Sequence, residues 1–367
     1  MAARPDISIV TSGHDVADAR LHRLVAALDR AGQRVEVLGL GLPDAGPPEA
    51  ECRTWPRAGQ LGRLVQALRW PWRARGRVLV SLDPDSALGC GLRRLVLGPR
   101  RLAWVAESHE DYVALLEDRS WAQGLARHLG LAVARAGARA ARRADLTVVV
   151  DDHLMPRAHR RLVSPNLPDL TMLPPPGPPE ATPRAIYVGD IGLSRGLMTM
   201  LELALAAPTW RFDLIGPVNP ADQAALDSFM ASHLALASRL RFHGRMPPRQ
   251  AWALARGAWV GLSLLENTKA FAPTMPSKIY EYLACGLPVL TSPLERPAEL
   301  VERSGAGAVV GEAAEAARVL EGWSSDAAAF GRVLAAAAAQ GQEVIEASGQ
   351  MDQLAGLLKL MAARFRR

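Results

Sequence analysis

The sequence has few cysteines and almost no lysine, and each scarcity narrows what the chain can be. Its three cysteines, Cys52, Cys90 and Cys285, include no C-x-x-C pair, which argues against a disulfide framework or a zinc cluster. Of the 43 basic residues only Lys269, Lys278 and Lys359 are lysines. Arginine is therefore the default cation, and a compact, mobile ammonium is a distinct choice wherever it occurs.

Long apolar runs are also missing. No uninterrupted apolar stretch in the sequence reaches the ~18–20 residues that a membrane-spanning helix needs. The N-terminal Met-Ala-Ala-Arg-Pro-Asp runs into a short strand and lacks the apolar core of a signal peptide. We therefore expect a cytoplasmic protein, either soluble or peripheral on the inner face of the membrane.

The bulk composition is that of a globular protein with a basic surface. A length of 367 residues is enough for two domains with sizeable cores. Apolar residues make up 49% and charged residues 22% of the chain, which are ordinary values. The net charge of +6 and a pI near 9.7 indicate a polyanionic or anionic-surface partner.

Short apolar strands alternate with helical patterns in the first part of the chain. Residues 6–11 and 33–39 are predicted strands, separated by a turn at 12–14 and a helix at about 15–31. This order is the opening of a doubly wound α/β domain. Further strands are predicted at 77–82, 102–106 and 146–150, and a helix at 121–143.

A proline-rich segment at 165–183 divides the chain, because such proline density gives an extended spacer. A second α/β series follows, with strands predicted at 185–188, 211–215, 241–243, 259–264 and around 308–310. We therefore predict an α/β fold of two Rossmann-like doubly wound domains facing across a cleft. The expected parts are an N-terminal domain at 1–170, a linker at 171–184, a C-terminal domain at 185–345 and a helical segment at 346–367 that packs back on the N-terminal domain.

The stretch 274–290 predicts a loop, a short helix ended by Gly286, and a buried strand. Lys278 and Glu281 lie three residues apart on one side of that helix. A cation beside a helix N-terminus attracts phosphate, and a carboxylate one turn later can accept from a ribose diol. The alternative is a surface ion pair worth ~0.2–0.5 kcal/mol.

Two segments are rich in arginine and poor in acid. Residues 53–77 carry seven arginines with Trp55, Trp70 and Trp72, and residues 119–143 carry six arginines. A solvated basic face explains this composition, and so does contact with an anionic membrane surface, which binds arginine with tryptophan. Nucleic acid is not an expected partner, because no nucleic-acid-binding motif accompanies the charge.

At this point the motifs resemble a known family. Pro276–Val289 has the form Pro-x-Lys-x-x-Glu-Tyr-x-Ala-x-Gly-x-Pro-Val, which resembles the donor-site motif of GT-B glycosyltransferases of retaining family 4. Tyr187–Gly196 resembles the glycine loop of that family with its downstream cation. Glu107–Glu110 resembles the aspartate-x-His-Glu at the end of an N-domain strand, and Arg143–Val149 the Ala-Asp strand before the interdomain segment.

The resemblance implies a role for individual residues. Glu281 would bind the ribose hydroxyls of a nucleotide sugar, and Lys278 and Arg195 would clamp its diphosphate. Gly13, after the first strand, would let the backbone approach the phosphates or the sugar. His109 would be the catalytic-site residue that lines the acceptor side and contacts the transferred sugar.

Two positions depart from the family pattern. The first glutamate of the family motif is Pro273 here, and Glu266 is the candidate to take over part of its donor-binding work. The arginine usual after the glycine of the loop is Asp190 here, which puts an anion where the family has a phosphate-binding cation.

The resemblance thus implies a metal-independent hexosyltransferase-type enzyme with no cofactor. Its donor would be a nucleotide diphosphate sugar, and its acceptor a glycan, a lipid-linked intermediate of polysaccharide biosynthesis or a small molecule. A nucleotide-sugar epimerase or hydrolase of the same fold, and an inactive donor-binding subunit of a polysaccharide assembly complex, are the alternatives. Asp83-Pro84-Asp85 suits a turn after a strand better than a metal site, and His14 is a further candidate near the acceptor.

Overall fold

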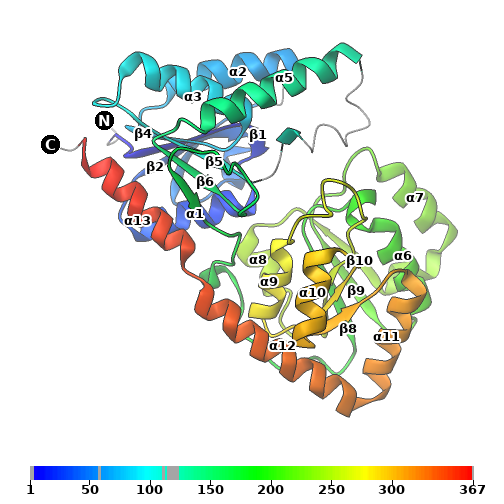
Figure 1. Cartoon of the computed structure of the whole chain (residues 1–367). Helices are drawn as coiled ribbons and strands as arrows, with labels where there is room; N and C mark the ends of the chain where they lie inside the picture. Colours follow the sequence, from blue (N-terminus) through cyan, green and yellow to red (C-terminus); the bar gives the residue numbers. More distant parts are fainter. Residues whose placement is uncertain (1–3, 57–58, 110–111, 114–123, 366–367) are drawn as a thin grey trace. The chain divides into compact units, whose positions relative to one another are not determined.

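The computed structural model describes residues 4–56, 59–109, 112–113 and 124–365. The chain forms two compact units, each built on its own parallel sheet (Figure 1). Unit 1 comprises Met1–Asn166 together with Gly349–Arg367, and unit 2 comprises Leu167–Ser348. No helix in the described residues is long and apolar enough to cross a membrane.

The sheet of unit 1 has seven strands in the order β3-β2-β1-β4-β5-β6-β7, all paired in parallel. The strands are β1 (Ile7–Asp15), β2 (Val35–Leu40), β3 (Ala50–Trp55), β4 (Val78–Ser81), β5 (Ala103–Ser108), β6 (Leu146–Val149) and β7 (Arg161–Val163). The helices are α1 (Ala19–Arg30), α2 (Gln60–Arg73), α3 (Pro84–Leu97), α5 (Gly124–Ala141) and α13 (Gln350–Ala363), with a 3-10 turn η1 (Pro43–Ala45).

These helices cover both faces of the sheet, as Figure 1 shows. Helices α1 and α13 pack on one face, where Ile7, Leu24 and Leu358 belong to one apolar cluster. Helices α2, α3 and α5 pack on the other, where Val10 and Trp70 belong to a second cluster. Because both faces are buried, the strands are near-continuous apolar runs.

The sheet of unit 2 has six parallel strands in the order β10-β9-β8-β11-β12-β13. The strands are β8 (Arg184–Val188), β9 (Arg211–Ile215), β10 (Leu240–Gly244), β11 (Val260–Ser263), β12 (Val289–Thr291) and β13 (Gly307–Val309). The helices are α6 (Leu197–Ala206), α7 (Gln223–Ser232), α8 (Pro248–Ala253), α9 (Ser277–Ala284), α10 (Glu295–Ser304), α11 (Ala313–Ser325) and α12 (Ala327–Ala347), with 3-10 turns η2 (Leu170–Met172), η3 (Leu193–Arg195) and η4 (Leu234–Ser238).

Two apolar clusters hold this sheet between its helices. One packs α6 and α11 against β8 and β9, with Met200, Phe212 and Leu320 fully or almost fully buried. The other packs α8 and α9 against the opposite face, with Trp252 and Tyr282 in edge contact at 5.4 Å. Helix α9 therefore sits on the sheet by its apolar side, which orients its remaining side chains.

The predicted α/β fold with two doubly wound parallel sheets is confirmed. The predicted start of the first helix at residue 15 is wrong. Strand β1 runs on to Asp15, and the helix begins at Ala19, where the Asp18 side chain accepts from the N–H of Leu21 at 3.0 Å. Strand β3 and helix α2 occupy the basic stretch for which no element was predicted. Trp121, at the start of the helix predicted at 121–143, lies outside the described residues.

Candidate functional site

A loop with two conformationally special glycines follows β8. Gly189 has φ +139°, and Gly196 has φ +83° at the start of α6. A Cβ on Gly196 would lie 1.8 Å from the carbonyl oxygen of Leu264. Both positions therefore require glycine because of their backbone conformation, and Gly196 also requires it because the Leu264 carbonyl group, just after β11, approaches so closely. The loop is held at the carboxyl edge of the sheet, where α/β proteins bind ligands.

Two buried tyrosines brace this loop. The Tyr187 hydroxyl donates to the carbonyl oxygen of Asp190 at 2.7 Å. The Tyr282 hydroxyl accepts from the N–H of Val188 at 2.9 Å and lies 3.3 Å from the carbonyl oxygen of Leu262. Tyr282, on α9, thereby ties the ends of β8 and β11 to the helix that carries Lys278.

Lys278 is a buried cation without a hydrogen-bond partner in the part of the chain that the structure describes. Its residue is 8% exposed, and its Nζ makes no hydrogen bond to a described residue. The Nζ lies 3.6 Å from the centroid of the Tyr187 ring, and a Cβ on Gly189 would come within 3.2 Å of it. Burial lowers the pKa of Lys278 well below its ordinary value, and the charge of Arg195 lowers this pKa further, against Glu281 and Asp190, which raise it.

Two of the other predicted donor residues, Arg195 and Glu281, act on this ammonium through their charges. Arg195 closes the glycine loop and lies over the Phe271 ring, with 5.6 Å between guanidinium carbon and centroid. Glu266 is exposed, and its backbone N–H donates to the carbonyl oxygen of Ser194 at 3.0 Å. Glu281 is buried one turn after Lys278 on α9. Since Lys278 and Glu281 are both buried, the surface ion pair considered from the sequence is not what forms.

Helix α9 begins without a side-chain cap. Its N-cap residue is Pro276, and no side chain of the described residues caps its first turn. Helix α6 likewise begins at Gly196 with no side-chain cap. Uncapped helix N-termini present N–H groups and a partial positive charge to an anion. Unit 2 thus combines two helix N-termini, a buried ammonium and a guanidinium around one loop.

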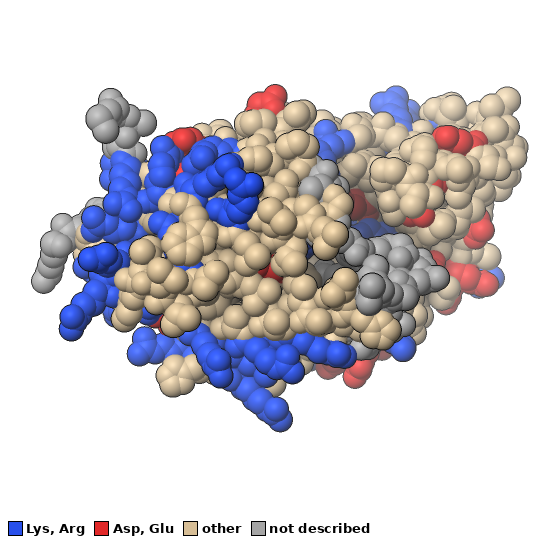
Figure 2. All heavy atoms as spheres, turned by 90° about the horizontal axis from the view of Figure 1, so that it is seen from above, with Lys and Arg blue, Asp and Glu red and all other residues tan. Residues whose placement is uncertain are grey.

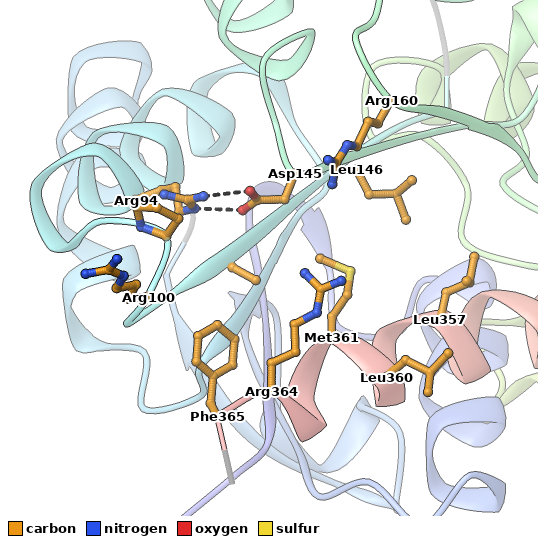
Figure 3. A pocket seen from close by; sticks show the side chains of 12 residues that line it. Arg94, Arg100, Asp145, Leu146, Arg160, Leu357, Leu360, Met361, Arg364 and Phe365 are labelled. Carbon is orange, nitrogen blue, oxygen red and sulfur yellow. Dashed lines mark hydrogen bonds and ion pairs between the residues drawn. The ribbon is translucent and has the colours of Figure 1, made fainter. Parts of the chain in front are cut away.

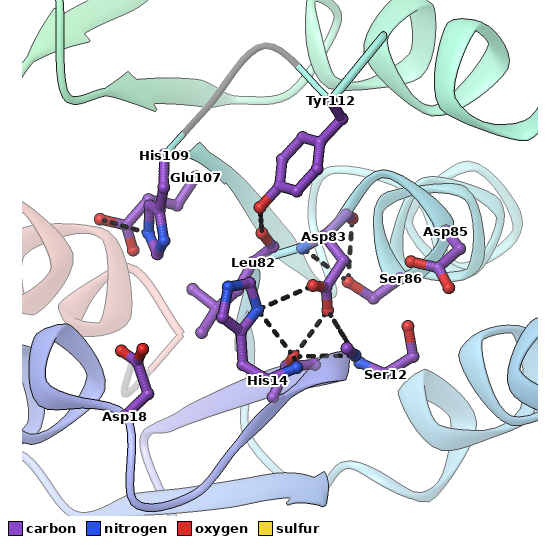
Figure 4. A network of polar contacts seen from close by, with 12 residues as sticks. Ser12, His14, Asp18, Leu82, Asp83, Asp85, Ser86, Glu107, His109 and Tyr112 are labelled. Carbon is purple, nitrogen blue, oxygen red and sulfur yellow. Dashed lines mark hydrogen bonds and ion pairs between the residues drawn. The ribbon is translucent and has the colours of Figure 1, made fainter. Parts of the chain in front are cut away.

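A second polar cluster lies in unit 1, centred on Asp83 (Figure 4). Thr11 Oγ1 donates to Asp83 Oδ2 at 2.6 Å, and the N–H groups of Ser12 and Gly13 donate to the same oxygen at 2.8 and 3.2 Å. His14 Nδ1 lies 2.8 Å from Asp83 Oδ1. Burial raises the pKa of Asp83, but His14, Arg63 and Thr11 outweigh it and hold the pKa below its ordinary value.

Gly13, predicted to approach the donor, is crowded by its own unit. A Cβ there would meet Nη2 of Arg63 at 2.6 Å and Oδ1 of Asp83 at 2.8 Å. Within unit 1, a Cβ at this position would therefore require the side chains of Arg63 and Asp83 to shift. Its donor-binding role stays a prediction, and so do the roles predicted for Arg195, Lys278, Glu281 and Glu266 in unit 2.

His109 joins the same cluster from the end of β5. Its ring lies edge-on to that of His14, with centroids 5.5 Å apart, and its Nε2 is 3.5 Å from Glu107 Oε1. Arg20 Nε donates to the same Glu107 oxygen at 2.7 Å. Burial raises the pKa of Glu107, but Arg20 and His109 lower it to about 2. Glu110, part of the same motif, lies outside the described residues.

Two paired histidines therefore meet at the carboxyl edge of the unit 1 sheet. The sequence pointed to His109 and held His14 as a further candidate, but it did not reveal that Asp83 and Glu107 are their partners. The available signal was the position of each acid: Asp83 directly follows the strand predicted at 77–82, and Glu107 directly follows the strand predicted at 102–106. Asp85, the second carboxylate of Asp83-Pro84-Asp85, is engaged by Arg63 Nε at 2.7 Å. The described residues contain no group of three or more side chains suited to a metal ion.

Two cavities open in unit 1. One of about 200 Å³ is lined by residues that include Tyr112, Arg142 and His153, together with Pro84 and Ser108, which are chain neighbours of Asp83 and His109. The other, of about 500 Å³, lies between the C-terminal end of α3 and α13 (Figure 3). There Arg94 pairs with Asp145 at 2.6 Å, and Met361 and Phe365 line the wall. None of the predicted site residues lines either cavity.

The chain was compared with protein families, with curated protein sequences and with solved structures. Residues 182–326 match the model of the family described as Glycosyl transferases group 1. No curated protein sequence matches the chain. Sucrose-phosphate synthase from Thermosynechococcus elongatus is similar in structure, with a TM-score of 0.72, 17% identity, and 98% of this chain and 100% of that chain covered.

Two further solved structures are similar over nearly the whole chain. Anabaena Alr3699/HepE in complex with UDP and glucose has a TM-score of 0.69 and 18% identity, with 97% of this chain and 99% of that chain covered. WaaG, a glycosyltransferase involved in lipopolysaccharide biosynthesis, has a TM-score of 0.63 and 13% identity, with 96% and 99% covered. These likenesses show that the chain has the GT-B fold, as predicted.

Proposed function

We propose that this chain is a glycosyltransferase that moves a sugar from a nucleoside diphosphate sugar to an acceptor hydroxyl. The observation that carries the proposal is the buried Lys278 ammonium, which has no hydrogen-bond partner among the described residues and lies close to Gly189 of the glycine loop. A buried charge without a partner costs free energy, so a protein retains one where an opposite charge is to bind. The ammonium lies within the segment that matches the glycosyltransferase family.

The donor diphosphate is the group that fits this charge. Its oxygens would accept from Lys278 and Arg195, and from the first N–H groups of α6 and α9. When the sugar transfers, the nucleoside diphosphate leaves with an additional negative charge. Fixed cations and helix N-termini stabilise that developing charge, so we propose departure without a metal ion or cofactor.

The nucleoside would be oriented by the carboxylates nearby. Glu281, one turn beyond Lys278, would accept from the ribose diol, and Glu266 would contribute from the loop after β11. Asp190 is exposed and raises the pKa of Lys278, which favours the charged ammonium while it repels phosphate. UDP is the first nucleotide to test, because HepE was solved with UDP and with UDP-glucose.

We propose that unit 1 receives the acceptor. His109 would contact the transferred sugar, and His14 would lie beside the incoming hydroxyl with its tautomer set by Asp83. The cavity of about 200 Å³, lined in part by Ser108, offers Tyr112, Arg142 and His153 to a polar acceptor. The acceptor class we propose is a glycan or lipid-linked intermediate, with retention at the anomeric carbon as in family 4.

The test is turnover of nucleotide sugars in the presence and absence of acceptor glycans. A transferase releases nucleoside diphosphate in step with acceptor glycosylation. Release without acceptor would instead indicate a hydrolase, a new sugar epimer an epimerase, and binding without turnover a donor-binding subunit. Lys278→Met should abolish turnover, whereas Lys359→Met, at an exposed lysine of α13, should leave it unchanged.

A further inference from the structure

The outer surface of α2 carries an exposed apolar stripe. Leu61, Val65, Leu68 and Trp72 are all exposed, with Leu61 at 76%. They are spaced four, three and four residues apart, so they lie along one side of the helix. The opposite side packs on the sheet through Trp70, which is 2% exposed. The helix is therefore apolar on two sides, and only one of them meets the core.

The neighbouring helices extend this stripe into a surface. Helix α3 packs against both α2 and α5. It exposes Leu92, Leu95 and Val96, with Leu95 at 79%, and α5 exposes Leu129. Eight of the fifteen large exposed apolar side chains in the described residues therefore belong to these three helices. Single exposed apolar residues are ordinary, but a gathered set marks a binding surface.

The charge of the same three helices is almost entirely positive. Their sequences contain eight arginines, of which Arg69, Arg73, Arg135 and Arg139 are exposed. Arg93 is buried, and Arg63 and Arg94 are paired with Asp85 and Asp145. Their only acid is Asp85, which is buried and paired with Arg63. Figure 2 looks down on this layer and shows the blue of arginine bordering a broad tan area with little red. We call this layer of α2, α3 and α5 the arginine–leucine face.

We propose that the arginine–leucine face docks on an anionic lipid bilayer. Exposed leucine, valine and tryptophan side chains enter the boundary between headgroups and acyl chains. The exposed guanidinium groups of Arg69, Arg73, Arg135 and Arg139 would bind lipid phosphates, often with two hydrogen bonds each. Apolar burial and charge attraction act together, so anionic lipid is needed for stable binding.

The observations weigh against other occupants. A second copy of this chain would set arginine against arginine, because the face offers no exposed acid to pair with. A nucleic acid would use the arginines but would leave the Leu61–Trp72 stripe without an apolar partner. The inference does not depend on the proposed transferase activity. Of the residues on the arginine–leucine face, only Arg63 and Asp85 also belong to the histidine cluster, where they serve as internal partners, and none belongs to the donor cluster.

Co-sedimentation with lipid vesicles tests the proposal with the full chain. We expect binding to phosphatidylcholine vesicles that contain phosphatidylglycerol, weak binding to phosphatidylcholine alone, and a loss of binding as salt rises. The double variant Leu61→Gln/Leu95→Gln should bind at least about tenfold more weakly, because two apolar anchors are lost. Arg69→Glu should weaken binding to the anionic vesicles specifically.

A matched control is available in unit 2. Leu234 is 78% exposed, close to Leu61 and Leu95, so Leu234→Gln makes the same chemical change elsewhere. It should bind vesicles as the wild type does, and the thermal unfolding of all variants should match. Equal binding to neutral vesicles would overturn the proposal. So would an unaffected double variant, or a dimer in solution that the double variant abolishes.

Discussion

Replacing Lys278 by methionine should make the free protein more stable and remove its response to nucleotide. Methionine keeps the volume and flexibility of the side chain but carries no charge. The buried ammonium now costs several kcal/mol of desolvation, by the usual scale for an ion removed from water. A cation–π contact with Tyr187 at 3.6 Å returns about 2 kcal/mol at such a site.

The net cost of Lys278 is therefore about 1–2 kcal/mol in the free protein, after the repulsion from Arg195 and the attractions of Glu281 and Asp190 are included. For a folding unit of this size, about 1 kcal/mol corresponds to roughly 2–4 °C in Tm. We expect Lys278→Met to raise the Tm by roughly 2–8 °C, measured by differential scanning calorimetry. Nucleotide at one hundred times its Kd should stabilise the wild type by about 2.7 kcal/mol and the variant not at all.

The pH dependence has a definite sign. Because the folded-state pKa of Lys278 lies well below 10.5, the folded protein binds this proton less readily than the unfolded chain. The cost is present at neutral pH and disappears as pH rises toward 10.5, where the unfolded chain also loses the proton. The Tm advantage of Lys278→Met should shrink over the same range. A variant less stable than the wild type, with its nucleotide response intact, would refute the reasoning.

Three further predictions concern the supports of the two clusters. Gly189→Ala should weaken nucleotide binding, measured by calorimetric titration, by at least about tenfold. The φ of +139° suits only glycine, and a Cβ would lie 3.2 Å from Lys278 Nζ. The control Gly322→Ala, where a Cβ has open space, should leave nucleotide binding unchanged. Tyr282→Phe should cost about 1–3 kcal/mol in urea unfolding, because the Val188 N–H loses its acceptor; no change would show that water replaces the hydroxyl. Glu107→Gln should lower the free energy of unfolding by about 3–5 kcal/mol at neutral pH and make stability less dependent on acid pH. The pKa of Glu107 is lowered to about 2 from 4.5, so its contribution to stability is present above pH 4.5 and is lost as pH falls toward 2. An unaltered dependence of stability on acid pH would contradict the pairing with Arg20.

Much of the fold could be predicted because both sheets are parallel and covered on both faces. Such strands are apolar runs, which are visible in a sequence without long-range information. Strand β3, with the sequence Ala-Glu-Cys-Arg-Thr-Trp, is at most half-buried at the edge of its sheet. It therefore has no such run, and its arginine and tryptophan favoured a different interpretation of the segment.

The candidate site was predictable only in part, for a related reason. Lys278 and Glu281 belong to one helix, so their spacing placed them on one side of it, but the spacing left a surface ion pair open as an alternative to a donor site. Asp83 bonds to Thr11 across 72 positions of the chain, and no local pattern contains that contact. The side of α2 that packs on the sheet could not be predicted either, because a sequence with Trp70 and Trp72 does not reveal which tryptophan faces the core.

The central claim is that Lys278 forms the anion-binding centre of a nucleotide-sugar site. Isothermal titration of UDP, GDP, CDP and ADP into the wild type, Lys278→Met and Lys359→Met tests it most directly. We predict that at least one nucleotide binds the wild type and Lys359→Met with the same Kd and does not bind Lys278→Met. Binding of none of the four to the wild type, or equal binding to Lys278→Met, would contradict the claim.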